Sequence, residues 1–249
     1  MNSIVCIKRV PDTETRVRIG PDGKNIDPSG VKYVLNPYDE IALEEAIRLK
    51  EQAGSGTVTV MTVGEDDSKE TLRTALAMGA DEAVLLRASP GMDALPVARA
   101  LADAIRSRDF DLVMFGKQAV DDDNMQVPPM VAELLELPSA TVVVGLEVTD
   151  GRGVARREIE GGHEVVEFTM PAVISAQKGL NEPRYPSLKG IMAAKKKPME
   201  EVDVELGAPR LSVEAITLPV ERSGAGFKGE GADAVPELVR MLHQEAKAI

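Results

Sequence analysis

Residues 58–86 read VTVMTVGEDDSKETLRTALAMGADEAVLL, two apolar runs joined by a helical pattern. The runs at 58–63 and 83–86 are short, and each predicts a buried strand. Residues 68–78 repeat apolar side chains about every 3.6 positions, which predicts a helix, and Gly79 stands where helices favour a closing glycine. A strand, a helix and a second strand in this order predict parallel strands joined by a crossover helix.

The same alternation extends on both sides of this unit. Apolar runs at 4–7 and 112–115 predict two more strands, and helical patterns cover 38–53, 94–106 and 125–135. Asn36 followed by Pro37 suits the N-cap and first turn of a helix, and Gly54 suits its end. Residues 1 to about 140 are therefore predicted to form a Rossmann-like α/β fold with a mostly parallel, doubly wound sheet.

The pattern changes to strands beyond residue 140. Residues 140–147, 154–160 and 164–170 predict strands, with Glu160 to His163 as a hairpin turn, and residues 171–176 predict a strand that returns to the main sheet. We therefore expect one α/β domain over 1–197, with a β-hairpin insertion at about 150–170.

The last part of the chain, 198–249, is expected to be an appendage. Residues 198–232 are rich in proline, glycine and charge without regular periodicity, which predicts an extended arm. Residues 234–248 predict a terminal amphipathic helix that docks either on this chain or on a partner. The stretch Gly224 to Gly229 formally matches G-x-G-x-x-G, but no strand follows it, so we reject it as a dinucleotide fingerprint.

Composition excludes several classes of function. A chain of 249 residues with 43% hydrophobic content can bury a full core, and a net charge of −12 argues against nucleic-acid binding. The single cysteine, Cys6, forms no internal disulfide, which fits a reducing compartment, and two histidines leave little for metal. No apolar stretch reaches the roughly 18 residues of a membrane span, so we expect a soluble cytoplasmic protein without membrane insertion.

The segment GKQAVDDDNMQVP at 116–128 is the strongest candidate for a site. It follows the fourth predicted strand and enters a helix, the position where open α/β sheets bind ligands. Asp123 or Asn124 would cap that helix, and free backbone N–H groups could hold a phosphate. The adjacent carboxylates of Asp121, Asp122 and Asp123 would repel a phosphate unless they point elsewhere, and a solvated acidic turn is the alternative interpretation.

Three other segments lie at comparable positions. Residues 36–39 lead into the first helix, while 8–11 and 63–65 leave the first and second strands. With 116–127 they could line one crevice sized for an adenosine whose phosphate rests on backbone amides. No nucleophile, paired-carboxylate or metal pattern accompanies them, and Cys6 within an apolar run is interpreted as a small buried hydrophobe.

A second candidate, LNEPRYPSLKGIMAAKKKP at 180–198, indicates a contact surface. Pro183 and Pro186 predict an extended loop over 181–187, and Gly190 would open a short helix that ends in three solvated lysines. Leu188 would then sit near the tip of a protruding loop. A leucine there either binds a partner or packs back onto the core, and the residues alone leave both open.

These stretches resemble the β subunit of electron-transfer flavoproteins. The resemblance rests on VLNPYDEIALEEAIRLKE at 34–51, TLRTALAMGADEAVLL at 71–86, GKQAVDDDNMQ at 116–126 and REIEGGHE at 157–164, followed by LNEPRY at 180–185. It implies a fold of the adenine-nucleotide-binding type and a heterodimer whose α subunit binds most of the FAD. It further implies a buried structural AMP in this chain, and an electron carrier with no catalytic residues of its own.

The resemblance also assigns residues. It implies that residues 181–190 form a recognition loop for dehydrogenases anchored by Leu188, and that Glu158 pairs with an arginine of the mobile flavin domain and so orients that domain. The implied AMP-lining residues are Cys6, Asn36, Pro37, Tyr38, Asp39, Val63, Gly116, Lys117, Gln118, Ala119, Val120, Asp121, Asp122, Asp123, Asn124, Met125, Gln126 and Val127. The implied partner-binding residues are Asn181, Glu182, Pro183, Arg184, Tyr185, Pro186, Ser187, Leu188, Lys189 and Gly190.

The expected role is to accept electrons from acyl-CoA and related dehydrogenases, as in fatty acid β-oxidation, and pass them to a quinone oxidoreductase. A eukaryotic homologue would do so in the mitochondrial matrix. One alternative is a bifurcating relative with a second FAD in place of AMP, although Asp122, Asn124 and Met125 differ from its usual loop and favour AMP. Another alternative, from a different class, is a stand-alone ATP-binding or ATP-hydrolysing protein.

Overall fold

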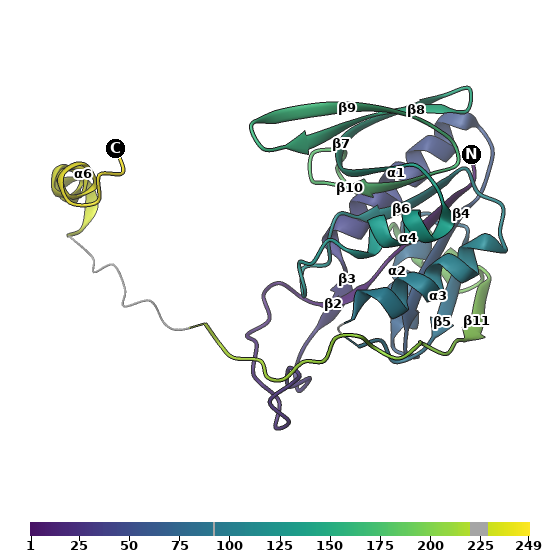
Figure 1. The fold of residues 1–249 in the computed structure, drawn as a ribbon, viewed down its shortest axis with the longest axis horizontal. Helices are drawn as coiled ribbons and strands as arrows, with labels where there is room; N and C mark the ends of the chain where they lie inside the picture. The colour runs from purple at the N-terminus through teal and green to yellow at the C-terminus, as the bar shows by residue number, and fades with distance from the viewer. Residues whose placement is uncertain (92, 220–228) are drawn as a thin grey trace.

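A computed structural model describes residues 1–91, 93–219 and 229–249. Within them, nine strands form one sheet in the order β11-β5-β4-β1-β6-β10-β7-β8-β9 (Figure 1). Its central strands are parallel: β1 (Ser3–Cys6), β4 (Val58–Gly64), β5 (Glu82–Arg87), β6 (Leu112–Gly116) and β10 (Ala172–Ala176). The predicted Rossmann-like α/β class is confirmed.

Helices cover both faces of this sheet. α1 (Pro37–Ala53) and α2 (Ser68–Met78) pack over Val5, and α3 (Ala94–Arg106) and α4 (Val127–Leu135) pack over Ile4. Because successive residues of a strand point to opposite faces, one strand supplies both cores. All four helices were predicted, although α4 begins two residues later than expected. None of the helices in the described part of the chain has the length and apolar character needed to cross a bilayer.

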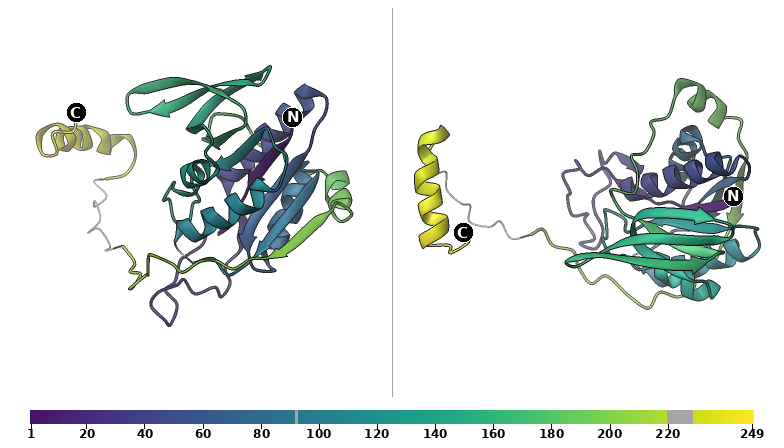
Figure 2. Two further views of the ribbon diagram at one scale, coloured as in Figure 1. Left: turned by 45° about the vertical axis from the view of Figure 1, so that its right-hand side comes forward. Right: turned by 90° about the horizontal axis from the view of Figure 1, so that it is seen from above.

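The predicted hairpin is part of a larger antiparallel unit at one edge of the sheet. β7 (Ser139–Thr149) pairs with β8 (Arg152–Ile159), which pairs with β9 (Gly162–Thr169). Asp150 and Gly151 both have positive φ, and they form the turn that joins β7 to β8. Figure 2 shows the three strands extending beyond the helical layers.

A small separate sheet follows β1. β2 (Arg9–Pro11) and β3 (Tyr33–Leu35) are antiparallel and enclose the loop between them, which sequence patterns did not predict. The Arg9 guanidinium lies 3.7 Å from the centre of the Tyr33 ring. This sheet fixes the path of the chain from β1 to the start of α1.

Residues 198–232 were predicted to form only an extended arm, and this prediction is wrong for its first residues. β11 (Met199–Asp203) joins the edge of the main sheet, parallel to β5. Arg87 of β5 forms ion pairs with Glu201 and Asp203 of β11 and with Asp66 before α2. β11 is mostly exposed and charged, so its sequence lacks the apolar alternation that marks a strand.

Beyond β11 the chain runs along the molecule and then leaves it. The amides of Arg210 and Leu211 donate to Asp93, and the amide of Ile216 donates to the carbonyl oxygen of Gly23. A 3₁₀ turn (Gly231–Ala234) precedes α6 (Val235–Gln244), which lies apart from the sheet in Figures 1 and 2. The rejected glycine motif at 224–229 falls almost wholly outside the described residues.

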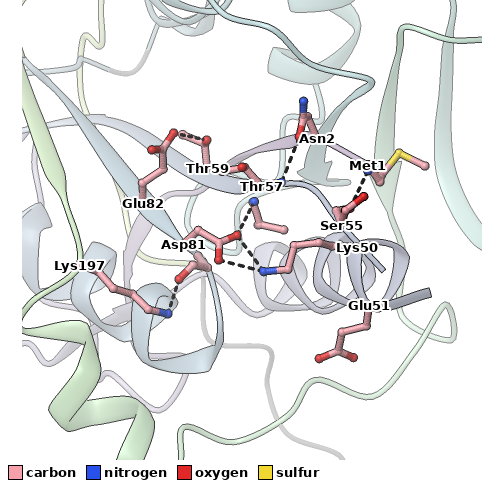
Figure 3. A network of polar contacts seen from close by, with 12 residues as sticks. Met1, Asn2, Lys50, Glu51, Ser55, Thr57, Thr59, Asp81, Glu82 and Lys197 are labelled. Atoms are coloured by element: carbon pink, nitrogen blue, oxygen red, sulfur yellow. Dashed lines mark hydrogen bonds and ion pairs between the residues drawn. The ribbon is translucent and has the colours of Figure 1, made fainter. Parts of the chain in front are cut away.

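Polar contacts hold the amino ends of the strands together (Figure 3). Asp81 accepts hydrogen bonds from the amide of Val58 at 2.7 Å and from Lys50 Nζ at 2.8 Å. Lys197 Nζ donates to the carbonyl oxygens of Leu76 and Ala80 at the end of α2, so the prediction of a solvated Lys197 is wrong. The contacts of Lys197 fasten the segment after α5 (Leu188–Ala194) to the body of the fold.

Candidate functional site

The predicted crevice segments meet at the carboxyl ends of the central strands. Cys6 ends β1, Gly116 ends β6, and residues 36–39 begin α1 between them. Val63 lies near the end of β4, two residues beyond Met61, which pairs with Cys6. The elements therefore bring these segments to one edge of the sheet, the edge where α/β folds bind ligands.

Asp39 is the buried centre of this arrangement. Its Oδ2 accepts a hydrogen bond from the amide of Lys8 at 2.7 Å, and its Oδ1 accepts one from the amide of Gly116 at 2.9 Å. Burial raises the pKa of Asp39 to about 7, and the hydrogen bonds from Lys8 and Gly116 offset this only in part. One carboxyl group thus joins the ends of β1 and β6 to the first turn of α1.

Position 116 requires glycine because α1 approaches the end of β6 very closely there. A Cβ atom at this position would lie 2.5 Å from Asp39 Oδ1 and 2.6 Å from the carbonyl carbon of Tyr38. Both distances are far below van der Waals contact, and the neighbours are backbone or a buried carboxyl that cannot move aside. Only glycine lets the loop after β6 begin this close to α1.

Asn36 holds the same loop further along. It occupies the N-cap position of α1, with Pro37 in the first turn, as predicted, but its side chain makes no capping hydrogen bond. Instead its Nδ2 donates to the carbonyl oxygen of Gln118 at 2.8 Å, and its Oδ1 accepts from the amide of Val120 at 3.2 Å. The fully buried side chain thereby fixes the middle of the loop.

The loop itself exposes backbone donors. Asp123 and Met125 have φ of 51° and 56°, a left-handed conformation that turns successive amides toward a concave side and favours anions. Among the residues that the structure describes, no hydrogen-bond acceptor is found for five amides of this loop, those of Gln118, Ala119, Asp121, Asp122 and Met125. They can therefore donate to a phosphate or to water.

The end of the loop differs from the prediction. Gln126, not Asp123 or Asn124, occupies the N-cap position of α4, and no side chain caps the helix. Pro128 and Pro129 have no N–H, so the first turn of α4 offers few donors. Any phosphate at this edge must rely on the amides of the loop rather than on the helix end.

The three aspartates of the loop have partners within the protein. Lys8 Nζ contacts Asp121 Oδ1 at 2.8 Å and Asp122 Oδ2 at 3.0 Å, and the side chain of Gln118 donates to Asp123. Burial lowers the pKa of Lys8, but attraction to Asp121 and Asp122 outweighs burial and raises it overall. Sequence patterns did not assign Lys8 this role, because its partners lie more than a hundred residues away.

Cys6 is buried as predicted, and burial followed by the negative charge of Asp39 raises the pKa of its thiol. A raised thiol pKa disfavours the thiolate that a nucleophile needs.

Within the described residues, no group of three or more histidine, cysteine, aspartate or glutamate side chains is placed to hold a metal ion. Two hollows of about 460 Å³ lie elsewhere, beside α3 and at the amino ends of the strands, and share no residue with the crevice.

The segment 181–190 is held firmly on α1. Arg184 donates from Nε and Nη2 to Glu44 at 2.8 and 3.0 Å, and from Nη1 and Nη2 to Glu51 at 2.7 and 3.1 Å. Asn181 donates to the carbonyl oxygen of Ile41 and to Glu45. The root of the loop is therefore fixed at two points.

Its tip projects into solvent. Leu188 is 83% exposed, so the alternative that it packs back onto the core is wrong, and Tyr185 is 94% exposed. α5 begins at Leu188, with Ser187 Oγ accepting from the amide of Gly190, whereas the sequence predicted a start at Gly190. Met192, which the sequence did not single out, is also exposed and enlarges the apolar surface.

Glu158 lies on the exposed part of β8, as predicted. Its Oε2 accepts a hydrogen bond from Gln177 Nε2 at 2.9 Å, just beyond the end of β10. Its neighbour Arg157 is bound to Thr141 and Glu164. Within the part of the chain that the structure describes, Glu158 therefore has an uncharged partner and forms no ion pair.

Together these features define a Rossmann-like α/β protein with an amide-lined loop at its ligand-binding edge and an apolar contact loop on α1. The family described as "Electron transfer flavoprotein domain" matches residues 24–206. The electron transfer flavoprotein subunit beta of Bacillus subtilis is 43% identical over 260 residues, covering 100% of both chains. That of Mus musculus is 40% identical over 239 residues, covering 92% of this chain and 93% of the relative.

The chain therefore belongs to the electron transfer flavoprotein family, on its β-subunit branch. Its role is electron transport as part of a flavoprotein. The resemblance inferred from the motifs at 34–51, 71–86 and 116–126 is confirmed.

Proposed function

We propose that this chain is the β subunit of a heterodimeric electron-transfer flavoprotein that binds AMP in the crevice at 6, 36–39, 63 and 116–127. The observation that carries the proposal is the loop after β6, whose unpartnered amides are held in place by Asn36 and Asp39. A preformed set of donors with a glycine at its entrance fits a phosphate monoester. In this role AMP is structural rather than a substrate, as the family resemblance implies.

FAD is proposed to be shared, with most of its contacts made by the α subunit. When bound, FAD supplies the electron-accepting ring system. This chain contributes positioning rather than acid–base or nucleophilic chemistry, which is why we classify it as a carrier subunit and not an enzyme. Glu158 would help to orient the mobile flavin domain, because among the described residues its exposed carboxylate has only Gln177 as a partner.

The electron donors are proposed to be acyl-CoA and related dehydrogenases, and the acceptor a quinone oxidoreductase. The support is the rigidly anchored loop 181–190 with Tyr185 and Leu188 at its tip. A rigid apolar tip suits repeated docking, because little conformational freedom is lost on each encounter. The cytoplasm, or the mitochondrial matrix in a eukaryote, would be the location of this relay.

The chain is proposed to divide in function at about residue 197. Residues 1–197 form the nucleotide-binding body, completed by β11, and the remainder forms an arm whose helix docks on the α subunit. α6 supports this division, because the side chains of Val235, Leu238 and Val239 on it are about half exposed. Such apolar residues are commonly covered in an assembly.

The test is to co-express this chain with its α subunit, denature the purified heterodimer, and count the released nucleotides by chromatography and mass spectrometry. One FAD and one AMP per heterodimer is the expected result. Two FAD without AMP would instead establish the bifurcating alternative, in which the second flavin occupies the crevice. The residues Asp122, Asn124 and Met125 favour AMP.

The remaining alternative is a stand-alone ATP-binding or ATP-hydrolysing protein. It predicts tight ATP binding or ATP turnover by the isolated chain, measured by calorimetry and phosphate release. Failure to bind a flavin-containing α subunit, together with ATP turnover, would replace our proposal with this one.

A further inference from the structure

The proposed phosphate site has an electrostatic problem. Two of its unpartnered amides belong to Asp121 and Asp122, whose own carboxylates lie in the same turn. A phosphate carries up to two negative charges, and two unneutralised carboxylates within several ångströms would repel it by roughly as much as the amides attract it. Something must neutralise these side chains, either a bound cation or a group of the protein.

Lys8 is placed to do this. Its Nζ lies 2.8 Å from Asp121 Oδ1 and 3.0 Å from Asp122 Oδ2, so a single ammonium bridges both carboxylates. Its backbone is fixed as well, because the amide of Lys8 donates to the buried Asp39. The same residue is thus held at both ends, and its charge faces the loop from the end of β1.

The other charged groups of the loop do not share this position. Asp123 is bound by the side chain of Gln118, and Lys117 Nζ lies 5.2 Å from the centre of the Tyr38 ring, in a cation–π contact. In the described parts of the chain, Lys8 is the only cation that forms an ion pair with Asp121 or Asp122. The loop therefore depends on one lysine for its charge balance.

We infer that Lys8 is a positioning residue for the nucleotide: its ammonium cancels the charge of Asp121 and Asp122 and holds them away from the amides that receive the phosphate. The inference rests on the proposed function, since it concerns the same crevice. It also means that AMP binds without a divalent cation, because the protein supplies the positive charge.

The experiment uses the heterodimer formed with the α subunit. AMP is first counted in the wild-type complex, with and without EDTA, and then titrated onto complexes freed of AMP. The variants are Lys8→Met, Asp121→Asn with Asp122→Asn, and the triple substitution. Lys32→Met is the matched control, because Lys32 forms an ion pair of 3.0 Å with Asp12 outside the crevice.

The expected result is a charge-rescue pattern. Lys8→Met should weaken AMP binding by about tenfold or more, the size of a charge interaction near a protein surface, while Lys32→Met leaves it unchanged. The double asparagine variant should bind AMP at least as well as wild type. The triple variant should recover to within about threefold of wild type, because it has neither the carboxylates nor the need for Lys8.

Any other result contradicts either the inference about Lys8 or the proposed function, and the two cases can be told apart. Wild-type affinity in Lys8→Met, or release of AMP by EDTA alone, overturns the inference while leaving the proposed function intact. A triple variant as weak as Lys8→Met also overturns it, since Lys8 would then contact the phosphate or support the fold directly. A wild-type heterodimer without AMP overturns both the proposed function and the inference before any variant is compared.

Discussion

Replacing Arg184 by methionine tests whether the contact loop is anchored by the fork of hydrogen bonds to α1. The substitution keeps an unbranched apolar stem and removes the guanidinium, which donates twice to Glu44 and twice to Glu51. The side chain of Glu44 is only 7% exposed, whereas that of Glu51 is 55% exposed. The hydrogen bonds to Glu44 and those to Glu51 are therefore expected to contribute differently to the free energy of unfolding.

The magnitude follows from these exposures. Removing one partner of a fully buried ion pair costs ~3–5 kcal/mol, and an exposed pair contributes ~0–1 kcal/mol. Because Arg184 is itself 35% exposed, water screens part of the charge left on Glu44, and we expect a total loss of ~2–3 kcal/mol. Lysine at this position should recover less than half, since an ammonium cannot bind both carboxylates as a planar fork does.

The assay is denaturant unfolding of the isolated chain, with Arg240→Met as the control for a guanidinium paired on an exposed helix. In the heterodimer, Arg184→Met should also slow electron transfer from an acyl-CoA dehydrogenase, while FAD and AMP content stay at wild-type values. A loss of stability below ~0.5 kcal/mol would refute the energetic reasoning. Unchanged transfer kinetics despite the lost stability would refute the claim that a rigid loop matters for docking.

Four further predictions concern single residues of the crevice, the contact loop and the hairpin. Gly116→Ala should lower the AMP content of the heterodimer by about tenfold or more, because a Cβ there would lie 2.5 Å from a buried carboxylate oxygen; full AMP content on chromatography would contradict this. Burial raises the pKa of Asp39 to about 7, so the folded chain keeps a proton that the unfolded chain releases near pH 4. Relative to Asp39→Asn, wild-type stability should therefore fall by up to ~1.4 kcal/mol per pH unit as pH rises from about 4 to about 7, and parallel unfolding curves would exclude this effect. Leu188→Ala should slow transfer from dehydrogenases without loss of FAD or of the heterodimer, because its exposed side chain lies on the contact loop and outside the core, and loss of either would argue for a structural role. Glu158→Ala should change transfer rates modestly and reduce their dependence on ionic strength, and identical salt profiles would argue against an electrostatic latch.

The sequence predicts a strand or helix correctly where the residues of that element show a clear apolar pattern. The unit from β4 through α2 to β5 was predicted closely, because buried parallel strands read as continuous apolar runs. β11 was missed for the opposite reason. It lies at an edge, exposes most of its side chains, and is held by backbone pairing with β5 and by the ion pairs of Arg87.

The candidate site shows the same division. Motif position pointed to the loop after β6 and to residues 36–39, and the structure brings these together. The particular contacts were not foreseen: Asn36 occupies the predicted N-cap position, but its side chain binds the loop instead of capping the helix. Lys8 was placed only within a segment that lines the crevice, and its ion pairs with Asp121 and Asp122 were not foreseen.

What the sequence by itself determined was the fold class, the order of its elements, the family and the edge of the sheet where the site lies. Each follows from local periodicity, from motif order, or from the rule that parallel strands end together. Only the tertiary structure decided which side chains meet there. Asp39 contacts the amide of Gly116, and Lys8 contacts Asp121, across separations of 77 and 113 residues. Such contacts depend on how helices pack on the sheet, a property of side-chain volume and burial in three dimensions that no local pattern records.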